Sequence, residues 1–433
     1  AVVFGTTILG SNPSAPANFM LLINNIKKFL FPFYKSKKIK KIFEYLNDNG
    51  KNNVMLVGGC VRNYFNNETI KDIDLATTLS PGEVIKKLSK SNFKIIKTGI
   101  EHGTLTLSLE GDNFEITTLR EDISTDGRHA KVSFTDNWEK DSARRDFTIN
   151  AIYLDQNGKV FDPQNGLQDL KQKKVRFIGN TQERINEDYL RIIRFLRFSI
   201  QYENFDKDKE TLNIIKKNVP GILKISKERI FSEIIKIVNL ENIKNISLNE
   251  EFFEIFNIIF PEFKHVKRLR LVNNIIFEKL IKSDENLILA LLLVDETDNH
   301  NYFAHKYKIS NFLKDYLNFF HTYFYKAKRN KNFFGKDLKK NIFYHKKRNI
   351  ISLAKFYFAI INPKDFKKIN NVIRNINNTK IPEFPLNGQY LLNQGFKSGR
   401  KIGDVLKKIE EQWIENDFNL KDEDLNKLIK KYN

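Results

Sequence analysis

The sequence predicts an α+β protein in which a small mixed β-sheet with helices is followed by all-helical domains. Between residues 45 and 165, short runs rich in Val, Ile, Leu and Thr alternate with turn residues, which is typical of strands joined by short connections. From about residue 185 onward, apolar residues recur at helical spacing, with interruptions near Pro220, Pro261 and Pro363. The two patterns place the sheet first and the helices after it.

Individual elements of the first part follow from the same patterns. Apolar runs next to glycines or polar turns predict buried strands, and a Ser-Pro-Gly start predicts a helix. The expected strands are residues 53–59, 70–78, 103–109 and 114–120, and the expected helix is residues 81–90. The stretch "INEDYLRIIRFLRFSIQY" then begins the helical part.

Charge and composition indicate a polyanionic partner. The chain has 433 residues, and 73 Lys and Arg against 52 Asp and Glu give a formal charge of +21, which favours nucleic acid. Residues 301–350 hold 13 basic and 2 acidic side chains interleaved with aromatics, a pattern that suits contact with phosphates and bases. The alternative for this segment is a solvated, solubilising face.

Cysteine content and hydropathy bear on the compartment. The single cysteine, Cys60, has no partner for an intrachain disulfide, so we expect a reducing compartment and a packing role for its side chain. Residues 1–19 lack a basic leader, and no stretch of about 18 apolar residues occurs, so we expect a chain without membrane segments and with a flexible start.

The stretch "LVGGCVRNYFNNETIKDIDLATT" carries the clearest chemistry. In a strand, residues two apart share a face, so Asp72 and Asp74 present two carboxylates together, which suits a hard cation such as Mg²⁺. Gly58 and Gly59 let the backbone approach a phosphate closely, and Arg62 offers a charge-assisted fork to it. An Asp-x-Asp alone also fits a turn, a solvated strand edge or a sugar-nucleotide transferase, so the preceding glycines carry the nucleotidyl-transfer hypothesis.

Glu115 in "NFEITTLR" is an acid within an apolar strand. An unpaired charge there would be costly, so we expect Glu115 to have a partner. It is either a third catalytic carboxylate beside the metal or a member of an ion pair.

The stretch "EDYLRIIR" is expected to lie on one helix. Glu187, Asp188, Arg191 and Arg194 then fall on one polar side at three- and four-residue offsets. One interpretation is a surface helix with ion pairs. The other is that Asp188 and Arg191 imitate a Watson–Crick partner, because a carboxylate accepts from an exocyclic amine and a guanidinium donates to the ring beside it.

Together these stretches resemble the class II tRNA nucleotidyltransferases, the CCA-adding enzymes, which share their catalytic head with bacterial poly(A) polymerases. The resemblance runs from residue 54 to 198 through "LVGGCVRN", "DIDLATT", "GIEHGTLTL", "FEITTLRED", "DNWEKDSARRDFTINAIYLD", "VFDPQNGLQDL" and "RFIGNTQERINEDYLRIIRFLRF". A weaker similarity appears in "PLNGQYLLNQGFKSGRKIGDVLKKIEEQW". The resemblance implies a polymerase-β-like nucleotidyltransferase head followed by helical neck, body and tail domains.

The resemblance also implies roles for individual residues. Asp72 and Asp74 would bind two catalytic Mg²⁺ ions, and Gly58, Gly59 and Arg62 would bind the triphosphate. The ribose would be read by Arg145, Asp146 and Asn150 in "RRDFTINA", with Arg144 a weaker candidate. Without the resemblance, the arginines would be interpreted as capping groups and Asn150 as a backbone partner.

Nucleotide choice is implied for two further regions. In the family, the helix that carries Glu187, Asp188, Arg191 and Arg194 selects CTP first and ATP last, without a nucleic-acid template. The loop around Asp126, Gly127 and Arg128 resembles the flexible loop that helps the switch from C to A addition, with Gly127 as its hinge. Asp162 and Gly166 match a turn that supports this rearrangement, although "DPQNG" is also an ordinary turn signal.

One departure and one absence qualify the resemblance. Asn63 stands where the family usually has an aspartate, so an ionic contact near the triphosphate loop becomes at best a hydrogen bond. No His-Asp dipeptide occurs, so we expect no attached phosphohydrolase domain. The expected division is residues 1–44 as a flexible start with a first helix, 45–178 as the head, 179–240 as the neck, 241–330 as the body and 331–433 as the tRNA-binding tail.

The leading functional hypothesis is addition of C, C and A to tRNA 3′ ends from CTP and ATP, with pyrophosphate release. The tRNA acceptor arm and elbow would be the partner, in a cytoplasm or an organellar matrix, and the oligomeric state is left open between monomer and homodimer. A poly(A) polymerase is an alternative, but "TGIEHGTLTL" stands where it would carry a Gly-Arg-Arg-Phe-like segment. Two further alternatives are an enzyme that adds only CC or only A and a catalytically silent RNA-binding protein. A sugar-nucleotide transferase is a weaker alternative, because it would not need "RRDFTINA".

Overall fold

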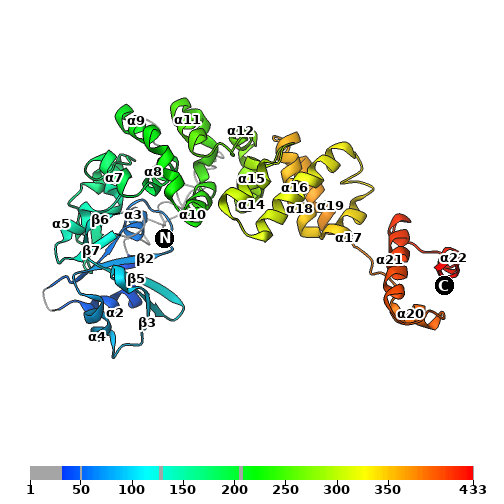
Figure 1. Cartoon of the computed structure of the whole chain (residues 1–433), viewed down its shortest axis with the longest axis horizontal. Helices are drawn as coiled ribbons and strands as arrows, with labels where there is room; N and C mark the ends of the chain where they lie inside the picture. The colour runs from blue at the N-terminus through cyan, green and yellow to red at the C-terminus, as the bar shows by residue number, and fades with distance from the viewer. Residues whose placement is uncertain (1–31, 49–50, 126–129, 204–207, 433) are drawn as a thin grey trace, which may run out of the picture. The chain divides into compact units, whose positions relative to one another are not determined.

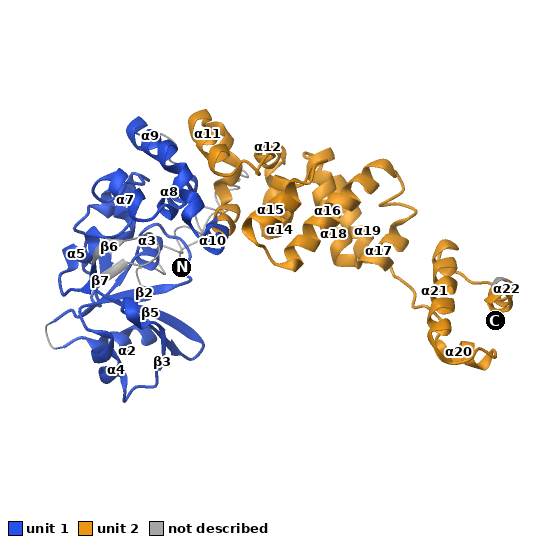
Figure 2. Cartoon of the chain, viewed as in Figure 1, with its two compact units in different colours: residues 1–233 blue, residues 234–433 orange. Residues whose placement is uncertain are grey.

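The structure is a computed structural model that describes residues 32–48, 51–125, 130–203 and 208–432. The chain divides into two compact units, Ala1–Glu233 and Ile234–Asn433 (Figures 1 and 2). The first unit contains a mixed sheet with helices, and the described part of the second is helical. The predicted α+β class is therefore confirmed. None of the described helices combines the length and the hydropathy that crossing a membrane requires.

The first unit is built on a seven-stranded sheet with the order β3-β4-β5-β2-β1-β8-β9. The sheet is mixed because β2 pairs in parallel with β5, whereas the pairs on either side are antiparallel. β6 and β7 form a separate two-stranded sheet. The strands are β1 (Val54–Val57), β2 (Ile73–Thr77), β3 (Lys94–Gly99), β4 (Thr104–Leu109), β5 (Asp112–Thr118), β6 (Arg120–Thr125), β7 (Ala130–Phe134), β8 (Tyr153–Leu154) and β9 (Val160–Phe161).

Helices connect these strands and continue after them. Those of the first unit are α2 (Lys37–Leu46), α3 (Gly59–Phe65), α4 (Pro81–Leu88), α5 (Trp138–Ala143), α6 (Gly166–Lys171), α7 (Thr181–Glu187), α8 (Leu190–Gln201) and α9 (Lys209–Asn218), with 3₁₀ turns at Phe33–Lys35, Ile100–His102, Thr148–Asn150 and Val219–Lys224. Helix α10 (Lys227–Val238) contains the boundary between the units.

The local sequence explains the elements that carry the site. All four residues of β1 are buried, as expected for the interior of a sheet covered on both faces. Helix α4 begins with a capping box, in which the Ser80 hydroxyl accepts from the Glu83 N–H while the Glu83 carboxylate accepts from the Ser80 N–H at 2.8 Å. The expected strands and this helix are all present, with ends shifted by a few residues.

Two segments differ from expectation. The residues after Gly58 were expected to form a loop, but Gly59–Phe65 is helix α3, so Arg62 lies on a helix. Strand β3 was not expected, because most of its side chains are exposed and its sequence lacks an apolar alternation. It forms because β4 offers it an antiparallel hydrogen-bonding edge.

The second unit is a series of helices. Helix α14 is buried over its whole circumference from Leu287 to Leu293, which marks it as the core around which α16 and α18 pack. The elements are α11 (Glu250–Ile259), α12 (Val266–Leu271), α13 (Asn274–Ile276), α14 (Glu285–Leu293), α15 (Asn299–Tyr307), α16 (Asn311–Arg329), α17 (Leu338–His345), α18 (Lys347–Ile361), α19 (Phe366–Asn378), α20 (Gly388–Asn393), α21 (Arg400–Glu415) and α22 (Asp422–Tyr432), with a 3₁₀ segment at Glu241–Leu248 and a π-helical turn at Phe277–Ile281.

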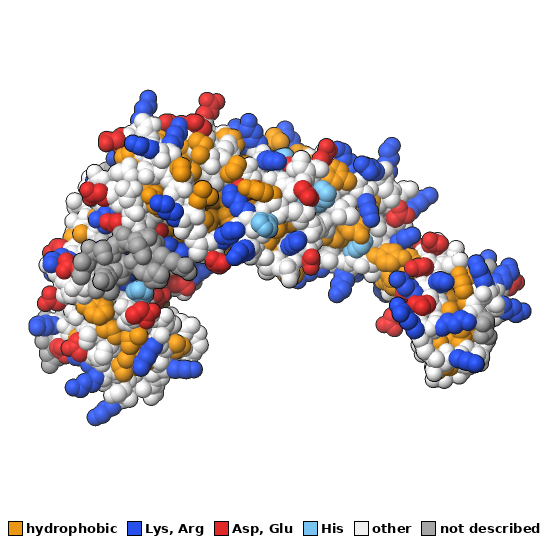
Figure 3. Space-filling view, in the orientation of Figure 1, with side chains coloured by type: hydrophobic (Ala, Val, Ile, Leu, Met, Phe, Trp, Pro, Cys, Tyr) orange, Lys and Arg blue, Asp and Glu red, His pale blue; other side chains and the backbone are white. Residues whose placement is uncertain are grey.

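The basic segment 301–350 combines core and surface roles. Several of its aromatic residues, including Phe320, Phe324 and Phe333, are buried and form core rather than a base-binding surface. The Lys326 ammonium lies 4.7 Å from the Tyr323 ring, so the aromatic and basic interleaving also occurs at the surface. On the face drawn in Figure 3, Lys and Arg side chains are spread over both units among hydrophobic ones.

Candidate functional site

A glycine turn opens the candidate site between β1 and α3. Gly58 has φ 73° and ψ −130°, a backbone conformation that L side chains rarely adopt. A Cβ at this position would lie 3.7 Å from Asp74 Oδ2 and 3.9 Å from Arg145 Nη1. The turn therefore brings an open stretch of backbone beside one carboxylate and one guanidinium.

Three carboxylates meet next to this turn. Asp72 is exposed just before β2, Asp74 is half-buried within β2, and Glu115 lies directly opposite Asp74 on the parallel strand β5. Burial raises the pKa of Asp74 to about 6, and the charges of Glu115 and Asp72 add to this, while Arg145 and Arg62 oppose it. Negative charge is therefore gathered around Asp74 on the paired interior strands β2 and β5.

Glu115 does not lie in the protein interior, contrary to the expectation from the sequence. Its side chain is exposed, because β5 alternates and places Phe114 and Ile116 in the core and Glu115 on the outer face. Glu115 is therefore not an interior charge in need of a partner. Its position opposite Asp74, rather than burial, is what brings it to the site.

These carboxylates suit a hard divalent cation. Magnesium takes oxygen ligands, commonly one or two carboxylates completed by substrate phosphates, and a cation here would relieve the repulsion that raises the pKa of Asp74. Within the part of the chain that the structure describes, no group of three or more His, Cys, Asp or Glu side chains is arranged to hold a metal by itself. The donor set fits a cation that arrives with its substrate.

Arg62 begins a buried polar chain that reaches from α3 to α8. Its Nη1 donates to Asn150 Oδ1, and Asn150 Nδ2 donates to Asp146 Oδ1 at 2.9 Å. Asp146 Oδ2 then accepts from Arg194 Nε and Nη2, both at 2.6 Å. The ring of Phe198 lies beneath both arginines, 4.7 Å from the Arg62 guanidinium. The chain brings together residues that were predicted for three different tasks: binding the triphosphate, reading the ribose and selecting the base.

Asp141 was not predicted, yet it fixes the arginine pair. It is 1% exposed and accepts from Arg144 Nε at 2.8 Å, from Arg145 Nη2 at 3.0 Å and from the Tyr153 hydroxyl at 2.8 Å. Burial alone would raise the pKa of Asp141, but Arg145, Arg144 and the Tyr153 hydroxyl together lower it to about 2. The sequence signal was available, because an acid three and four residues before two arginines on a helix places all three on one face.

The stretch "EDYLRIIR" is not a single helix. Helix α7 ends at Glu187, Asp188 has extended dihedrals of φ −155° and ψ 106°, and α8 begins at Leu190. Arg191 donates to Glu187 at 2.6 Å, and Asp188 forms its ion pair with Arg229 of α10 at 2.6 Å. The predicted polar residues are gathered, but Asp188 and Arg191 are paired with other partners instead of acting as one fork.

Two residues of α10 complete this region and were not predicted. Arg229 holds Asp188, and the buried Glu233 accepts from Arg197 of α8 at 2.7 Å. The Arg197 guanidinium lies 4.0 Å from the Phe198 ring, on which Arg62 also rests. The sequence gave no signal for these contacts, because they join positions that are 36 and 41 residues apart.

Asp162 forms a turn in the structure. Its two carboxylate oxygens accept from the backbone N–H of Gly166 at 2.8 Å and of Leu167 at 2.9 Å, which satisfies the start of α6. A Cβ at Gly166 would lie 2.1 Å from the Thr148 carbonyl oxygen, so the close approach requires glycine. Asp126, Gly127 and Arg128, the predicted flexible loop, lie outside the described residues.

Asn63 makes two hydrogen bonds of its own. Its side-chain oxygen accepts from Arg62 Nη2 at 3.1 Å, and its amide donates to the Thr69 carbonyl at 3.0 Å. The amide therefore still orients Arg62, and it ties the end of α3 to the segment that leads into β2. Cys60 is buried beside them, and burial raises the pKa of its thiol to about 12, which agrees with the predicted packing role.

Two family models and several solved structures are similar to this chain. Residues 54–176 match a family model described as the poly A polymerase head domain, and residues 204–266 match one described as a probable RNA and SrmB-binding site of polymerase A. A solved CCA-adding enzyme of Bacillus stearothermophilus in complex with CTP superposes with a TM-score of 0.66 at 23% identity, covering 87% of this chain and 92% of that one. That likeness concerns the fold.

Sequence relatives extend over most of the chain. The mitochondrial CCA tRNA nucleotidyltransferase 1 of Mus musculus is 33% identical over 392 residues, which are 87% of this chain and 86% of the relative. The CCA-adding enzyme of Streptococcus uberis is 33% identical over 392 residues, covering 87% of this chain and 92% of the relative. The alignments span both units, so they are not confined to the catalytic head. The chain therefore belongs to the family of CCA-adding tRNA nucleotidyltransferases.

Proposed function

We propose that the protein adds C, C and A to the 3′ ends of tRNA from CTP and ATP, without a template and with release of pyrophosphate. The observation that carries the proposal is the grouping of Asp72 and Asp74 with Gly58 and the buried Arg62, in a chain whose relatives over nearly its whole length are CCA-adding enzymes. The tRNA 3′ hydroxyl attacks the α-phosphate of the nucleotide, the α–β bridging P–O bond breaks, and pyrophosphate leaves.

Asp72 and Asp74 would hold two magnesium ions, which supply neutralisation of the triphosphate and activation of the hydroxyl when bound. Glu115 stands opposite Asp74 and adds a third catalytic carboxylate to that face. The protein's own contribution is to keep these acids close together despite their repulsion. The sheet does so, because the Asp74 and Glu115 backbones are paired in register.

The Gly58–Gly59 turn and Arg62 would bind the triphosphate. Gly58 and Gly59 offer backbone N–H groups without a side chain in the way, and Arg62 presents a guanidinium whose position is fixed by Asn150, Asn63 and the Phe198 ring. Arg145, held by Asp141 next to Gly58, is a second cation beside the same turn. Ordering these cations in advance lowers the cost of binding a flexible triphosphate.

Ribose and base selection fall to the polar chain and the α7–α8 junction. Asp146 and Asn150 would meet the ribose, and Asp188 and Arg191 the base edge, with Glu187 and Arg194 as supporting partners. A site built to satisfy buried donors and acceptors rejects GTP and UTP because their edges leave those groups unpaired. The ion pairs of Asp188 with Arg229 and of Arg191 with Glu187 hold the selecting side chains in place.

The remaining assignments concern movement, RNA and compartment. Asp126, Gly127 and Arg128 would assist the switch from C to A addition, and the Asp162 turn would support it. The division into head, neck, body and tail at residues 45–178, 179–240, 241–330 and 331–433 gives the helical part the task of holding the tRNA acceptor arm and elbow, through shape and phosphate contact. The cytoplasm or an organellar matrix is the proposed location, since relatives include bacterial and mitochondrial proteins.

The test uses tRNA transcripts that end before CCA, after CC, or after the complete CCA. The full chain is incubated with Mg²⁺ and with labelled CTP and ATP, separately and together, and the products are sized. Growth that stops at CCA, and is lost in the Asp72→Ala, Asp74→Ala double variant, supports the proposal. Glu44→Ala, which removes an exposed acid on α2 of the same unit, is the matched control and should remain active.

Each other product would change the assignment. Long A tails would identify a poly(A) polymerase, a function that the sequence relatives do not favour. Addition of only CC or only A would identify a partial enzyme. No incorporation by the wild type would favour an RNA-binding protein without catalysis. Activity that survives in the double variant would contradict the assignment of the two aspartates.

A further inference from the structure

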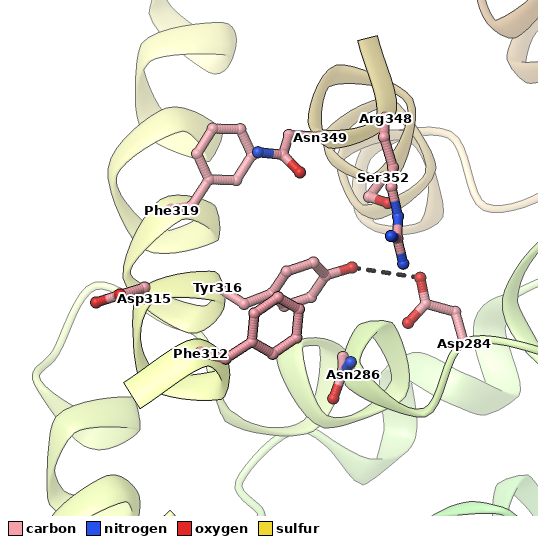
Figure 4. Close-up of a pocket in the computed structure, with 9 residues that line it drawn as sticks. All are labelled: Asp284, Asn286, Phe312, Asp315, Tyr316, Phe319, Arg348, Asn349 and Ser352. Atoms are coloured by element: carbon pink, nitrogen blue, oxygen red, sulfur yellow. Dashed lines mark hydrogen bonds between the residues drawn. The ribbon is translucent and has the colours of Figure 1, made fainter. Parts of the chain in front are cut away.

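A pocket lies within the helical second unit, separate from the candidate site. Its volume is about 330 Å³, which is within the usual range for small-ligand sites. Figure 4 shows that its walls come from the start of α14, from α16 and from α18. The lining residues are Asp284, Asn286, Phe312, Asp315, Tyr316, Phe319, Arg348, Asn349 and Ser352.

One wall is aromatic and partly uncovered. Phe312, Tyr316 and Phe319 follow one another along the same side of α16, and Phe312 is 65% exposed. The rings of Phe312 and Tyr316 are stacked, with centroids 6.3 Å apart and 26° between their planes. A phenylalanine ring left in water is unfavourable, and a flat aromatic ligand placed against it would remove that surface from water.

The pocket also offers polar groups that have no hydrogen-bond partner in the protein. Among the described residues, the side chains of Asn286, Asn349 and Arg348 make no hydrogen bond or ion pair. Figure 4 draws the Asn349 amide beside the Phe319 ring, and the Arg348 guanidinium near the Tyr316 hydroxyl and the Asp284 carboxylate. An amide supplies both a donor and an acceptor for a base edge, and a guanidinium is the usual fork for phosphate.

The two acids in the pocket are either fixed or turned away. Asp284 accepts from the Leu287 N–H at 3.0 Å and from the Tyr316 hydroxyl at 3.3 Å, so both of its oxygens already have donors. Asp315 points away from the other lining side chains in Figure 4. Arg348 is the cation of the lining, and an anionic group bound there would lie on the side of the guanidinium away from Asp284.

A neighbouring cavity continues from this pocket. It shares Asp284, Asn286, Arg348 and Ser352 with the first, and its further charged lining residues are Glu285, Lys347 and Lys355. Its volume is about 630 Å³. The two spaces share the Arg348 side chain, and the second adds two lysines against one acid, which suits a ligand with a flat apolar part and an attached anionic chain.

We propose that this pocket binds one nucleotide, with its base against the aromatic wall that includes Phe312, its polar edge at the asparagine amides, and its phosphate at Arg348. The combination of aromatic face, amide pairs and guanidinium within one small cavity carries the proposal. A free nucleoside triphosphate and an unpaired nucleotide of RNA share this chemistry. The RNA source rests on the proposed function, whereas a free nucleotide would be a second site independent of it.

Photo-crosslinking on the full chain tests the proposal with both sources. One arm uses labelled 8-azido-ATP, and the other a tRNA transcript without CCA that carries 4-thiouridine. Labelled peptides are mapped by mass spectrometry. The first variant, Phe312→Ala, removes the exposed ring, and Tyr302→Ala is its control, because Tyr302 is 58% exposed in the same unit but does not line the pocket. The second, Arg348→Gln, is compared with Arg374→Gln, another exposed arginine.

The proposal is supported if α16 or α18 is labelled beside the pocket in either arm. The amount of label should fall at least ten-fold in Phe312→Ala and in Arg348→Gln, and it should not fall in the two controls. The arm that gives the label identifies the source. Absence of label there in both arms, or label that Phe312→Ala leaves unchanged, overturns it. Labelling of the head by 8-azido-ATP is recorded in the same sample, and CTP and ATP incorporation is measured in parallel, so a failed pocket and a failed proposed function give different results.

Discussion

Replacing Asp141 by Asn removes the negative charge that holds Arg144 and Arg145 beside the candidate site. The pKa of Asp141 is about 2, compared with an ordinary value of 3.8, because burial is outweighed by the two arginines and the Tyr153 hydroxyl. Such a difference corresponds to about 2 kcal/mol of stability at neutral pH. The folded-state pKa is the lower one, so this stability is present above about pH 4 and is lost as the pH falls toward 2.

Tryptophan fluorescence can follow the unfolding of the head alone. The chain has two tryptophans, and Trp138 packs edge-on against Tyr153, with ring centroids 5.4 Å apart, directly beside Asp141. In a Trp413→Phe background, Trp138 is the only tryptophan, and urea unfolding is recorded between pH 7 and pH 2.5. Glu139→Gln is the matched control, because it makes the same acid-to-amide change at an exposed position of the same helix.

We expect Asp141→Asn to lower the free energy of unfolding by about 2 kcal/mol at pH 7. The difference from wild type should shrink as the pH falls below about 4, since the wild type then loses the same interaction. Glu139→Gln should change the stability by about 0.5 kcal/mol or less. A loss that is equal at pH 7 and pH 2.5, or no loss at all, would refute the electrostatic reasoning.

Three further predictions concern other parts of the first unit. Gly166→Ala should lower the temperature midpoint of unfolding of the head by several degrees, because its Cβ would meet the Thr148 carbonyl oxygen. Gly82→Ala is the control and should be neutral or stabilising, because the space around Gly82 on α4 is open. Equal midpoints for the two variants would contradict the close contact at Gly166. Cys60 should resist a thiol reagent until the head unfolds, since its pKa is raised to about 12 by burial; complete labelling of folded protein within minutes would show otherwise. Asp188→Ala should reduce the preference for CTP over UTP, measured as a ratio of kcat/KM, by about ten-fold or more, and an unchanged ratio would remove Asp188 from base selection.

Much of the site could be predicted because its residues occur in short, local sequence patterns. A glycine turn after a buried strand and two acids with a spacing of two in the next strand are local patterns, and strand geometry gives them one orientation. The structure places Gly58, Asp74 and Arg145 beside one another. The expectation for Glu115 was wrong in its reason, because an apolar run does not reveal which face of an alternating strand an acid occupies.

Interruptions of helices were harder to predict. The stretch around Asp188 has helical periodicity on both sides, and nothing in its residue types marks the extended backbone that separates α7 from α8. Packing supplies the reason. Gly221 lies so close to the Tyr189 ring that a Cβ there would be 2.1 Å from it, so the junction is shaped by a segment 32 residues further on.

The sequence by itself determined the fold class, the family and the kinds of side chain that the reaction needs, because these follow from local patterns along the chain. The tertiary structure alone decided which charges pair. Arg62 and Asn150 are separated by 88 residues, Arg194 and Asp146 by 48, and Asp188 and Arg229 by 41. A charged side chain leaves water only where packing brings a partner within hydrogen-bonding distance, so the partner depends on how distant elements meet and not on the neighbouring residues.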